Sequence, residues 1–366
     1  MKMLTVVGAR PQFVKAAIVS RALREYNNTA GADSRIDEII LHTGQHYDLF
    51  MSEVFFRELG ISVPDYQLEI NNLSHGAMTG RMLEKAEEIM LAEKPDLVLV
   101  YGDTNSTLAG ALAAAKQNIS LAHVEAGLRS RNRRMPEEIN RVLTDHAADL
   151  LFCPTAAAVE NLAAEGIKRG VYQVGDVMLD AFEYYRQLAG QKSSLLQDLR
   201  LVPGSYLLAT VHRAENTDDP ARLAAILAAF DDLATAEQPL VLPLHPRTLK
   251  LMEEHSLVLR RREVKIIPPV GYLDMVALET GAAVILTDSG GVQKEACFAG
   301  VPCVTLRQET EWVETVAAGM NVVAGGGTEE IISCCRQLAG RSVPREILPY
   351  GDGQAGRKIV EILLNR

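Results

Sequence analysis

Residues 283–299 read AVILTDSGGVQKEACFA, and this stretch decides the fold class. The apolar run Ala283–Thr287 has the length and the β-branched content of a buried strand, and Val292–Ala299 is predicted to form a helix. Between them stand Ser289 and two glycines, which allow a tight turn. Such a turn directs backbone N–H groups and a hydroxyl toward one point, where a phosphate can bind. The stretch therefore predicts a phosphate-binding turn in a parallel α/β domain.

The same alternation of short β-rich runs and helical stretches extends along the whole chain. In the first half, strands are predicted at Met3–Val7, Ile36–Leu41, Leu97–Tyr101, Leu121–Val124 and Leu150–Cys153. In the second half, they are predicted at Tyr206–Thr210, Leu240–Leu244, Val264–Ile267, Ala283–Thr287 and Pro302–Leu306. This rhythm predicts an α/β fold with two Rossmann-like, doubly wound parallel-sheet domains. Ligands of such sheets bind beyond the carboxyl ends of the strands, so we expect the domains to face each other across a cleft.

Length also favours two domains, because 366 residues exceed one ordinary hydrophobic core. We place the N-terminal domain at residues 1–175 and the C-terminal domain at residues 176–355. The polar, helical segment between about Gly175 and Pro203 is interpreted as the connection. The last helix, within 356–366, follows a break that contains proline and glycine, and it is therefore free to pack away from the second domain.

Composition indicates a globular protein, since 48% of the residues are hydrophobic and 23% are charged. The formal net charge of −10 argues against nucleic acid as a partner, because that affinity comes mainly from neutralising phosphates. No apolar stretch reaches the roughly 18–20 residues that span a bilayer, so no membrane insertion is expected. The first residues lead directly into a strand rather than a signal peptide, and the five cysteines form no CxxC pair. We expect a cytoplasmic protein.

The loop after the first strand carries two cations, Arg10 and Lys15. Gly8 allows the chain to turn, and Pro11 suits the first turn of a helix, so both cations would flank a helix N-terminus. Such a terminus attracts anions. The alternative interpretation is an ordinary strand–helix turn with solvated cations.

Carboxylates follow two further strands of the first half. Asp103 stands in YGDTNST and Glu125 in HVEAGLR, each just past a strand end where reactive groups collect. Asp103 could instead cap the next helix. Farther along, Glu137 opens a helix that carries Arg141 one turn later, although the helix dipole alone would explain an acidic first turn. The cations of the Arg129–Arg134 loop are interpreted as solvated.

In the second half, His212 and His245 also follow strand ends. A histidine there can contact a diphosphate or transfer a proton near neutral pH. Ser289, Gly290 and Gly291 form the phosphate-binding turn, and Glu295 lies one helical turn later, where it can accept bonds from ribose hydroxyls. The sequence contains no metal-ligand spacing, no GxGxxG and no P-loop.

These motifs resemble those of the non-hydrolysing UDP-N-acetylglucosamine 2-epimerases, which have the GT-B fold. The shared motifs are GARPQFVK, YGDTNST, HVEAGLR, MPEEINR, TVHRAEN, TDSGGVQKEA and ETEWVE, in the family's order and across nearly the whole chain. The resemblance implies a UDP-amino sugar as substrate, no cofactor, no metal and a homodimer. It implies elimination of UDP to a 2-acetamidoglucal followed by re-addition, for the synthesis of cell-surface polysaccharide precursors. It also implies that the last helix crosses back onto the first domain.

The resemblance also assigns roles to individual positions. Its catalytic residues match Lys15, Asp103, Glu125, Glu137, Arg141 and His212. Its UDP-binding residues match Arg10, His212, Ser289, Gly290, Gly291 and Glu295. In some bacterial members the substrate is also an allosteric activator, and Gln45, His46 and His245 lie near the matching positions.

Two departures from the better-known members concern the sugar. Ala9 and Gln12 stand where those enzymes have Thr and Glu, and the loop between Glu125 and Pro136 is shorter. Both features resemble a subgroup that includes epimerases of UDP-2,3-diacetamido-2,3-dideoxyglucuronate. The remaining alternatives are a GT-B glycosyltransferase, a catalytically silent UDP-sugar sensor and a hydrolysing epimerase.

Overall fold

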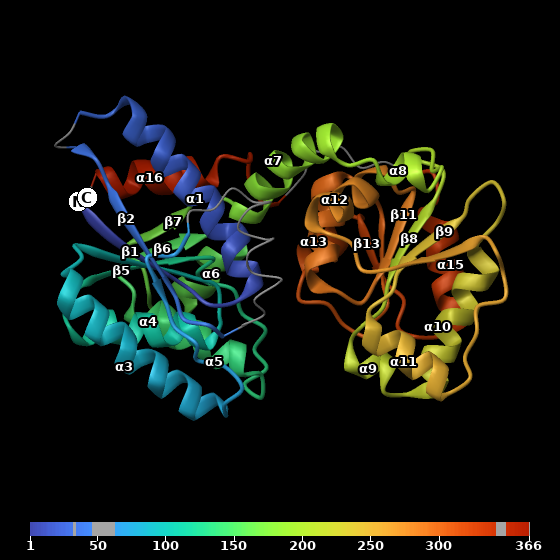
Figure 1. Ribbon diagram of the computed structural model, residues 1–366, viewed down its shortest axis with the longest axis horizontal. Coiled ribbons are helices and arrows are strands. Elements are labelled where there is room, and N and C mark those ends of the chain that lie inside the picture. The colour runs from blue at the N-terminus through green and yellow to red at the C-terminus, as the bar shows by residue number, and fades with distance from the viewer. Residues whose placement is uncertain (32–33, 46–62, 342–348, 366) are drawn as a thin grey trace. The chain divides into compact units, whose positions relative to one another are not determined.

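The chain forms two compact α/β units (Figure 1). The computed structural model describes residues 1–31, 34–45, 63–341 and 349–365, with Arg10 through its backbone only. The first unit consists of Met1–Ala181 and Tyr350–Arg366, and the second of Phe182–Pro349. The division therefore falls inside helix α7 (Val177–Lys192), whereas the sequence places the boundary ahead of this helix at residue 175.

The first unit is built on a parallel sheet of seven strands in the order β3-β2-β1-β4-β5-β6-β7. The strands are β1 (Lys2–Val7), β2 (Asp37–His42), β3 (Tyr66–Gln67), β4 (Leu97–Tyr101), β5 (Ser120–Val124), β6 (Leu150–Cys153) and β7 (Val171–Gln173). The chain winds outward from β1 to β3 and then returns to β4 beside β1. A ligand site is expected at the carboxyl ends of β1 and β4, where the winding direction reverses.

Helices cover both faces of this sheet. They are α1 (Arg10–Thr29), α3 (His75–Glu93), α4 (Asn105–Lys116), α5 (Pro136–Ala147), α6 (Ala156–Ala164) and α16 (Ala355–Leu364). The last of these packs against α1, as Figure 1 shows in red and blue. The contact is close at Gly356, where a Cβ atom would lie 2.9 Å from Ile18 Cγ2, and the Gly356 N–H donates to Asp180 at 2.8 Å.

The second unit repeats the design with six parallel strands in the order β10-β9-β8-β11-β12-β13. The strands are β8 (Leu207–Thr210), β9 (Leu240–Pro243), β10 (Val264–Ile267), β11 (Val284–Thr287), β12 (Cys303–Thr305) and β13 (Asn321–Val323). The helices are α8 (Leu195–Asp198), α9 (Ala214–Thr217), α10 (Pro220–Leu233), α11 (Pro246–Glu254), α12 (Tyr272–Gly281), α13 (Gly290–Ala299), α14 (Val313–Ala317) and α15 (Thr328–Leu338). Here the winding reverses between β8 and β11.

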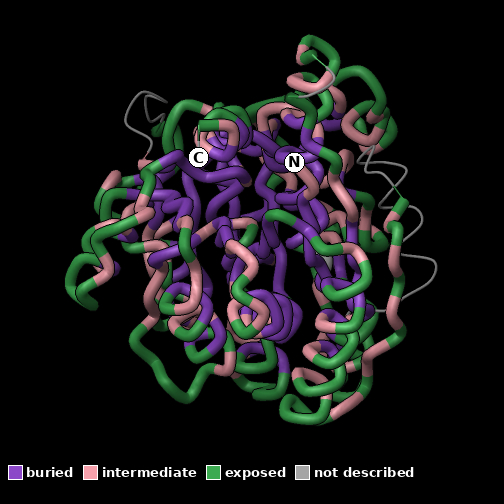
Figure 2. The backbone as a smooth tube through the Cα atoms, turned by 90° about the vertical axis from the view of Figure 1, so that its left-hand side faces the viewer, coloured by how far each residue is buried: buried purple, intermediate pink, exposed green. Residues whose placement is uncertain are grey.

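The predicted pair of doubly wound parallel-sheet units is confirmed. Buried residues concentrate in the strands, and exposed residues lie on loops and outer helical turns (Figure 2). Strand β4 is buried along its whole length, as expected for a central strand covered on both faces. Among the described residues, no helix has both the length and the apolar character that a membrane crossing requires.

Candidate active site

The loop after β1 is fixed by Gln12, one of the two positions at which the first motif departs from the family pattern. Its side chain is buried, and Oε1 accepts hydrogen bonds from the N–H groups of Gly8 (2.8 Å) and Ala9 (2.9 Å). Its Nε2 donates to the Tyr101 carbonyl at 2.7 Å and to Thr107 Oγ1 at 2.9 Å. Gln12 therefore binds the β1 loop to the carboxyl end of β4 and to helix α4.

Lys15 and Glu125 form an ion pair beside that loop. Both side chains are only 10% exposed, so their charges interact more strongly than a solvated pair would. Glu125 has a φ of 72°, the left-handed region that non-glycine residues rarely adopt. Backbone strain of this kind costs about 1–3 kcal/mol and concentrates at functional sites. The structure thus holds the Glu125 carboxylate in place against a conformational cost.

Asp103 forms the second ion pair, with Arg141 of helix α5. The other arm of Arg141 donates to Glu138 Oε2 at 2.9 Å. Asn140, on the same helix, donates its side-chain N–H to the Asp103 carbonyl at 2.9 Å. Helix α5 therefore positions Asp103 through its side chain and through its backbone.

The two adjacent glutamates of α5 differ in environment. Glu137 is exposed, whereas Glu138 is buried and accepts hydrogen bonds from Ser130 N (2.9 Å) and Arg131 N (2.8 Å). Burial opposes the charge of Glu138, but these N–H groups outweigh it and lower the pKa of the carboxyl group. Sequence reasoning missed Glu138 because nothing in the pattern distinguishes it from its neighbour. Its function here is to hold the preceding loop and to orient Arg141.

In the second unit, the buried carboxylate of Asp288 fixes the loop that carries His212. It accepts hydrogen bonds from the N–H groups of His212 (3.0 Å) and Arg213 (2.9 Å) and from Asn216 Nδ2 (3.0 Å). Burial lowers the pKa of His212, and the charge of Asp288 offsets this only in part, so the imidazole is neutral at pH 7. Asp288 is a further residue that the sequence did not single out, although it directly precedes the Ser-Gly-Gly turn.

The Ser-Gly-Gly turn opens helix α13 as predicted, and the helix begins at Gly290. Ser289 is the N-cap residue, and its hydroxyl accepts from the Val292 N–H at 3.5 Å. At Gly290, a Cβ atom would lie 2.6 Å from Glu311 Oε1, so a side chain there would displace that carboxylate. At Gly291, the nearest atom to such a Cβ is Ser289 Oγ at 3.8 Å, which leaves the turn accessible.

Glu295 lies inside α13, where it accepts a hydrogen bond from a phenol and lies near a buried carboxyl group. Tyr272 donates its hydroxyl hydrogen to Glu295 Oε1 at 2.9 Å. Glu279 is completely buried, and burial and then the charge of Glu295 raise the pKa of Glu279 well above 4.5. The folded protein therefore favours the uncharged form of Glu279 beside the carboxylate of Glu295.

Of the remaining predicted positions, the structure describes Gln45 and His245. Gln45 accepts from Ser106 N (3.1 Å) and Ser106 Oγ (2.9 Å) at the start of α4. His245 caps helix α11 by accepting from the Arg247 N–H at 3.2 Å. His46 and the side chain of Arg10 lie outside the described residues. In the described ranges, no group of three or more His, Cys, Asp or Glu side chains is arranged to hold a metal ion.

The first unit thus gathers Lys15, Asp103, Glu125 and Arg141 at the carboxyl ends of its central strands. The second places His212, the Ser-Gly-Gly turn and Glu295 at the corresponding ends of its own sheet. These are the two parallel-sheet units of the GT-B fold.

The chain belongs to the UDP-N-acetylglucosamine 2-epimerase family, whose model matches residues 28–364. It is 51% identical over 99% of both chains to the UDP-2,3-diacetamido-2,3-dideoxy-D-glucuronate 2-epimerase of Pseudomonas aeruginosa. It is 42% identical to the UDP-GlcNAc 2-epimerase of Methanocaldococcus jannaschii, solved in complex with UDP-GlcNAc and UDP, with a TM-score of 0.84 over 100% of both chains. It is 32% identical to the enzyme of Neisseria meningitidis bound to UDP-GlcNAc, with a TM-score of 0.86 and the same coverage. Such relatives are nucleotide-sugar 2-epimerases, which are isomerases.

Proposed function

We propose that this chain interconverts UDP-GlcNAc and UDP-ManNAc by inverting the configuration at C2 of the sugar. The observation that carries the proposal is the pair of carboxylates Asp103 and Glu125, which follow adjacent strands and are each bound to a cation. A family relative at 42% identity was solved with UDP-GlcNAc and UDP, which supports this substrate class.

The chemistry must overcome a C2 proton that is not acidic, because no carbonyl group is attached to C2. Loss of this proton together with the C1–oxygen bond to UDP solves the problem. The C2–H electron pair forms a C1=C2 double bond, UDP leaves with the C1–oxygen pair, and 2-acetamidoglucal remains bound. Addition of a proton to the opposite face of C2 and return of the UDP oxygen to C1 then give the epimer. This elimination and re-addition needs no oxidant or reductant.

In this proposal, two of Asp103, Glu125 and Glu137 act as base and acid on opposite faces of C2. The ion pairs with Lys15 and Arg141 hold the Glu125 and Asp103 carboxylates in place for this chemistry. A positioned acid or base contributes roughly 10²–10⁴-fold.

The residues of the second unit would bind UDP. The α13 N-terminus, with Ser289 and the following two glycines, offers N–H groups to the diphosphate. Glu295 would accept hydrogen bonds from the ribose. His212, whose pKa is lowered by burial, would stabilise the departing UDP oxygens.

A second substrate has its own support. The Pseudomonas aeruginosa relative at 51% identity is a UDP-2,3-diacetamido-2,3-dideoxy-D-glucuronate 2-epimerase. Ala9 is the N-cap of α1 and Gln12 lies in the first turn of that helix, bound to the carbonyl of Tyr101 at the end of β4. The departures at these positions would therefore bear on sugar choice rather than on UDP binding.

Product analysis tests the proposal. Purified protein is incubated separately with UDP-GlcNAc and with the diacetamido uronate, and ¹H and ³¹P NMR follow the sugars. Conversion of UDP-GlcNAc to UDP-ManNAc without accumulation of free UDP is the expected result. Conversion of the uronate alone would reassign the substrate, and free ManNAc with UDP would indicate a hydrolysing epimerase. Protein inactive on both sugars would contradict the proposal.

The cellular setting forms part of the same proposal. The protein would work in the cytoplasm as a homodimer and supply an amino-sugar donor for cell-surface polysaccharide. Light scattering that gives the mass of one chain would contradict the dimer.

A further inference from the structure

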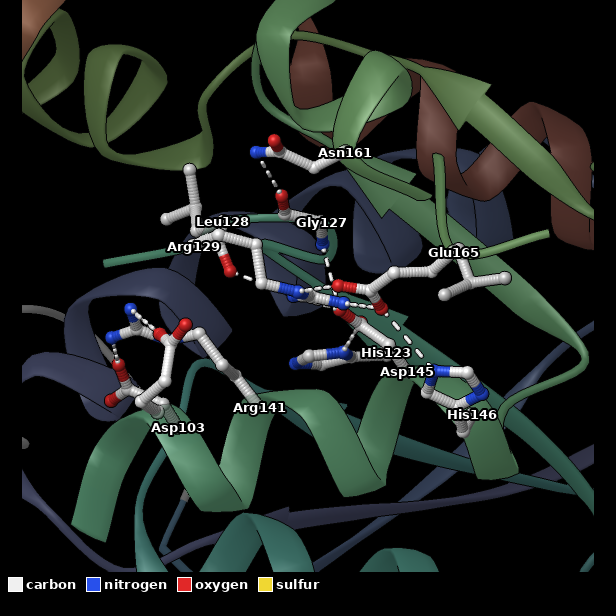
Figure 3. Close-up of polar contacts among 12 residues, drawn as sticks. Asp103, His123, Gly127, Leu128, Arg129, Arg141, Asp145, His146, Asn161 and Glu165 are labelled. Atoms are coloured by element: carbon white, nitrogen blue, oxygen red, sulfur yellow. Dashed lines mark hydrogen bonds and ion pairs between the residues drawn. The ribbon is translucent and has the colours of Figure 1, made fainter. Parts of the chain in front are cut away.

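A polar network around a buried histidine connects the loops that carry Asp103 and Glu125, and none of the proposed catalytic steps uses it. Figure 3 shows this network together with Asp103. At its centre is His123, which is completely buried near the end of β5. Its Nε2 lies 2.7 Å from the Gly102 carbonyl oxygen, and its Nδ1 lies 2.7 Å from Asp145 Oδ1. The ring therefore connects the Gly102 carbonyl to the Asp145 carboxylate.

The contact with Gly102 reaches the first catalytic loop. This carbonyl belongs to the peptide bond that joins Gly102 to Asp103. The N–H of Gly102 in turn donates to the Val124 carbonyl at 3.0 Å, so the residue is bound to β5 on both sides. Because Val124 directly precedes Glu125, these bonds fix the backbone spacing between Asp103 and Glu125.

Asp145 connects the ring to the second catalytic loop. Its Oδ2 accepts from the Gly127 N–H at 3.0 Å and from Arg129 Nη1 at 2.7 Å. Burial opposes the charge of Asp145, but the bonds to His123 and Arg129 outweigh it and lower the pKa of the carboxyl group. Asp145 lies one helical turn after Arg141 on α5, so one helix binds both the Asp103 side chain and the turn after Glu125.

Arg129 completes the network and is not solvated, contrary to the expectation for its loop. Its Nε and Nη2 donate to Glu165 Oε1 (2.7 Å) and Oε2 (2.8 Å), a two-bond pairing. Figure 3 shows the guanidinium between Asp145 and Glu165, with His146 beyond Glu165. The pairing binds the loop after Glu125 to the end of α6. Because Arg129 also bonds Asp145, the same pairing restrains the Asp145 carboxylate.

We infer that His123, held by Asp145, is a positioning residue that sets the separation of the Asp103 and Glu125 carboxylates. The inference rests on the proposed function of those two carboxylates. A buried ionic network contributes little net stability compared with apolar packing, so stability alone does not explain its place between both catalytic loops. Misplacement of reacting groups by about 1 Å can cost about 10²-fold in rate.

Two substitutions separate the bonds that the ring makes. In His123→Gln the amide nitrogen falls near the position of Nε2, so the donor to Gly102 is kept and the bond to Asp145 is lost. In His123→Asn it falls near Nδ1, so the bond to Asp145 is kept and the Gly102 carbonyl loses its donor. The matched control is Thr5→Val, which removes from the same sheet the 2.6 Å hydrogen bond that the fully buried Thr5 donates to the half-buried Glu38.

The kinetic experiment measures kcat, KM, UDP affinity and melting temperature for these proteins. His123→Asn is expected to lower kcat about 10²-fold, His123→Gln by much less, and UDP affinity is expected to be unchanged in both. Thr5→Val is expected to lower the melting temperature without this loss of kcat. Equal losses in both His123 variants, or a loss of the same size in Thr5→Val, would overturn the inference.

Hydrogen–deuterium exchange measures the positioning independently of turnover. Amides of residues 97–104 and 120–129 are expected to exchange faster in His123→Asn than in wild type, and Thr5→Val is expected to leave these segments unchanged. Unchanged exchange in His123→Asn would overturn the inference even if the wild type converts neither sugar, an outcome that contradicts only the proposed function.

Discussion

Replacing Glu279 with glutamine is expected to stabilise the second unit at neutral pH and to have little effect in acid. Glu279 is completely buried, and burial and then the Glu295 charge raise the pKa of its carboxyl group well above 4.5. In the folded protein the group stays protonated at pH values where the unfolded chain has already released the proton. The glutamine amide has nearly the same shape as the protonated acid and carries no charge at any of these pH values.

The sign and size of this stability change follow from the linkage between proton binding and folding. A raised folded-state pKa contributes stability that is fully present below the unfolded-state pKa and is lost as the pH rises toward the folded-state pKa. Within that window, wild type loses about 1.4 kcal/mol of unfolding free energy for each pH unit. Glutamine does not titrate, so the variant loses nothing from this site. The difference between variant and wild type should start near zero at about pH 4.5 and grow with that slope.

Urea unfolding at several pH values measures this difference. The sole tryptophan, Trp312, belongs to the second unit, so its fluorescence reports the unfolding of that unit. Glu237→Gln is the matched control, because Glu237 is exposed in the same unit and is solvated before and after unfolding. If the difference in unfolding free energy between Glu279→Gln and wild type stays constant or falls as the pH rises, the raised pKa of Glu279 is refuted.

Three further substitutions test the geometry of the two units, one in the second unit and a matched pair in the first. Tyr272→Phe removes the 2.9 Å hydrogen bond to Glu295 and should weaken UDP binding by about 0.5–1.5 kcal/mol in calorimetry; unchanged affinity would argue against Glu295 at the ribose. Gly102→Ala and Gly166→Ala each place a side chain at positive φ, +63° and +85°, and each should cost about 1–2 kcal/mol of stability. Only at Gly102 would the new Cβ lie 3.3 Å from Lys15 Nζ, whereas Gly166 faces open space. The Gly102 variant alone should therefore lose kcat, and equal kcat values in the two variants would contradict the placement of the Lys15–Glu125 pair.

Much of the fold could be predicted because the central strands are continuous apolar runs. Strand β4 is buried along its length and reads LVLVY, a continuous apolar run that predicts a buried strand. The edge strands β3, β7 and β13 contain only two or three residues and could not be predicted. Such short strands form because a neighbouring strand already offers hydrogen bonds, and that information is not local.

The candidate site also contains residues that could be predicted from the sequence and residues that could not. The positions of Asp103 and Glu125 follow from strand ends, which the sequence marks. The buried carboxylates Glu138, Asp145 and Asp288 could not be predicted, because each binds N–H groups from loops that only the folded chain brings together. Arg129 was expected in solvent for the related reason that its partner Glu165 is 36 residues away.

The central claim is that two carboxylates exchange the proton at C2 of the sugar. Its most direct test is the reaction of UDP-GlcNAc in D2O, with mass spectrometry and NMR used to read deuterium at C2 of the product. We expect one solvent deuterium at C2 with wild type, and rates lower by roughly 10²-fold or more with Asp103→Asn and with Glu125→Gln. Epimerised product with no deuterium at C2, or near-normal turnover by both variants, would contradict this claim.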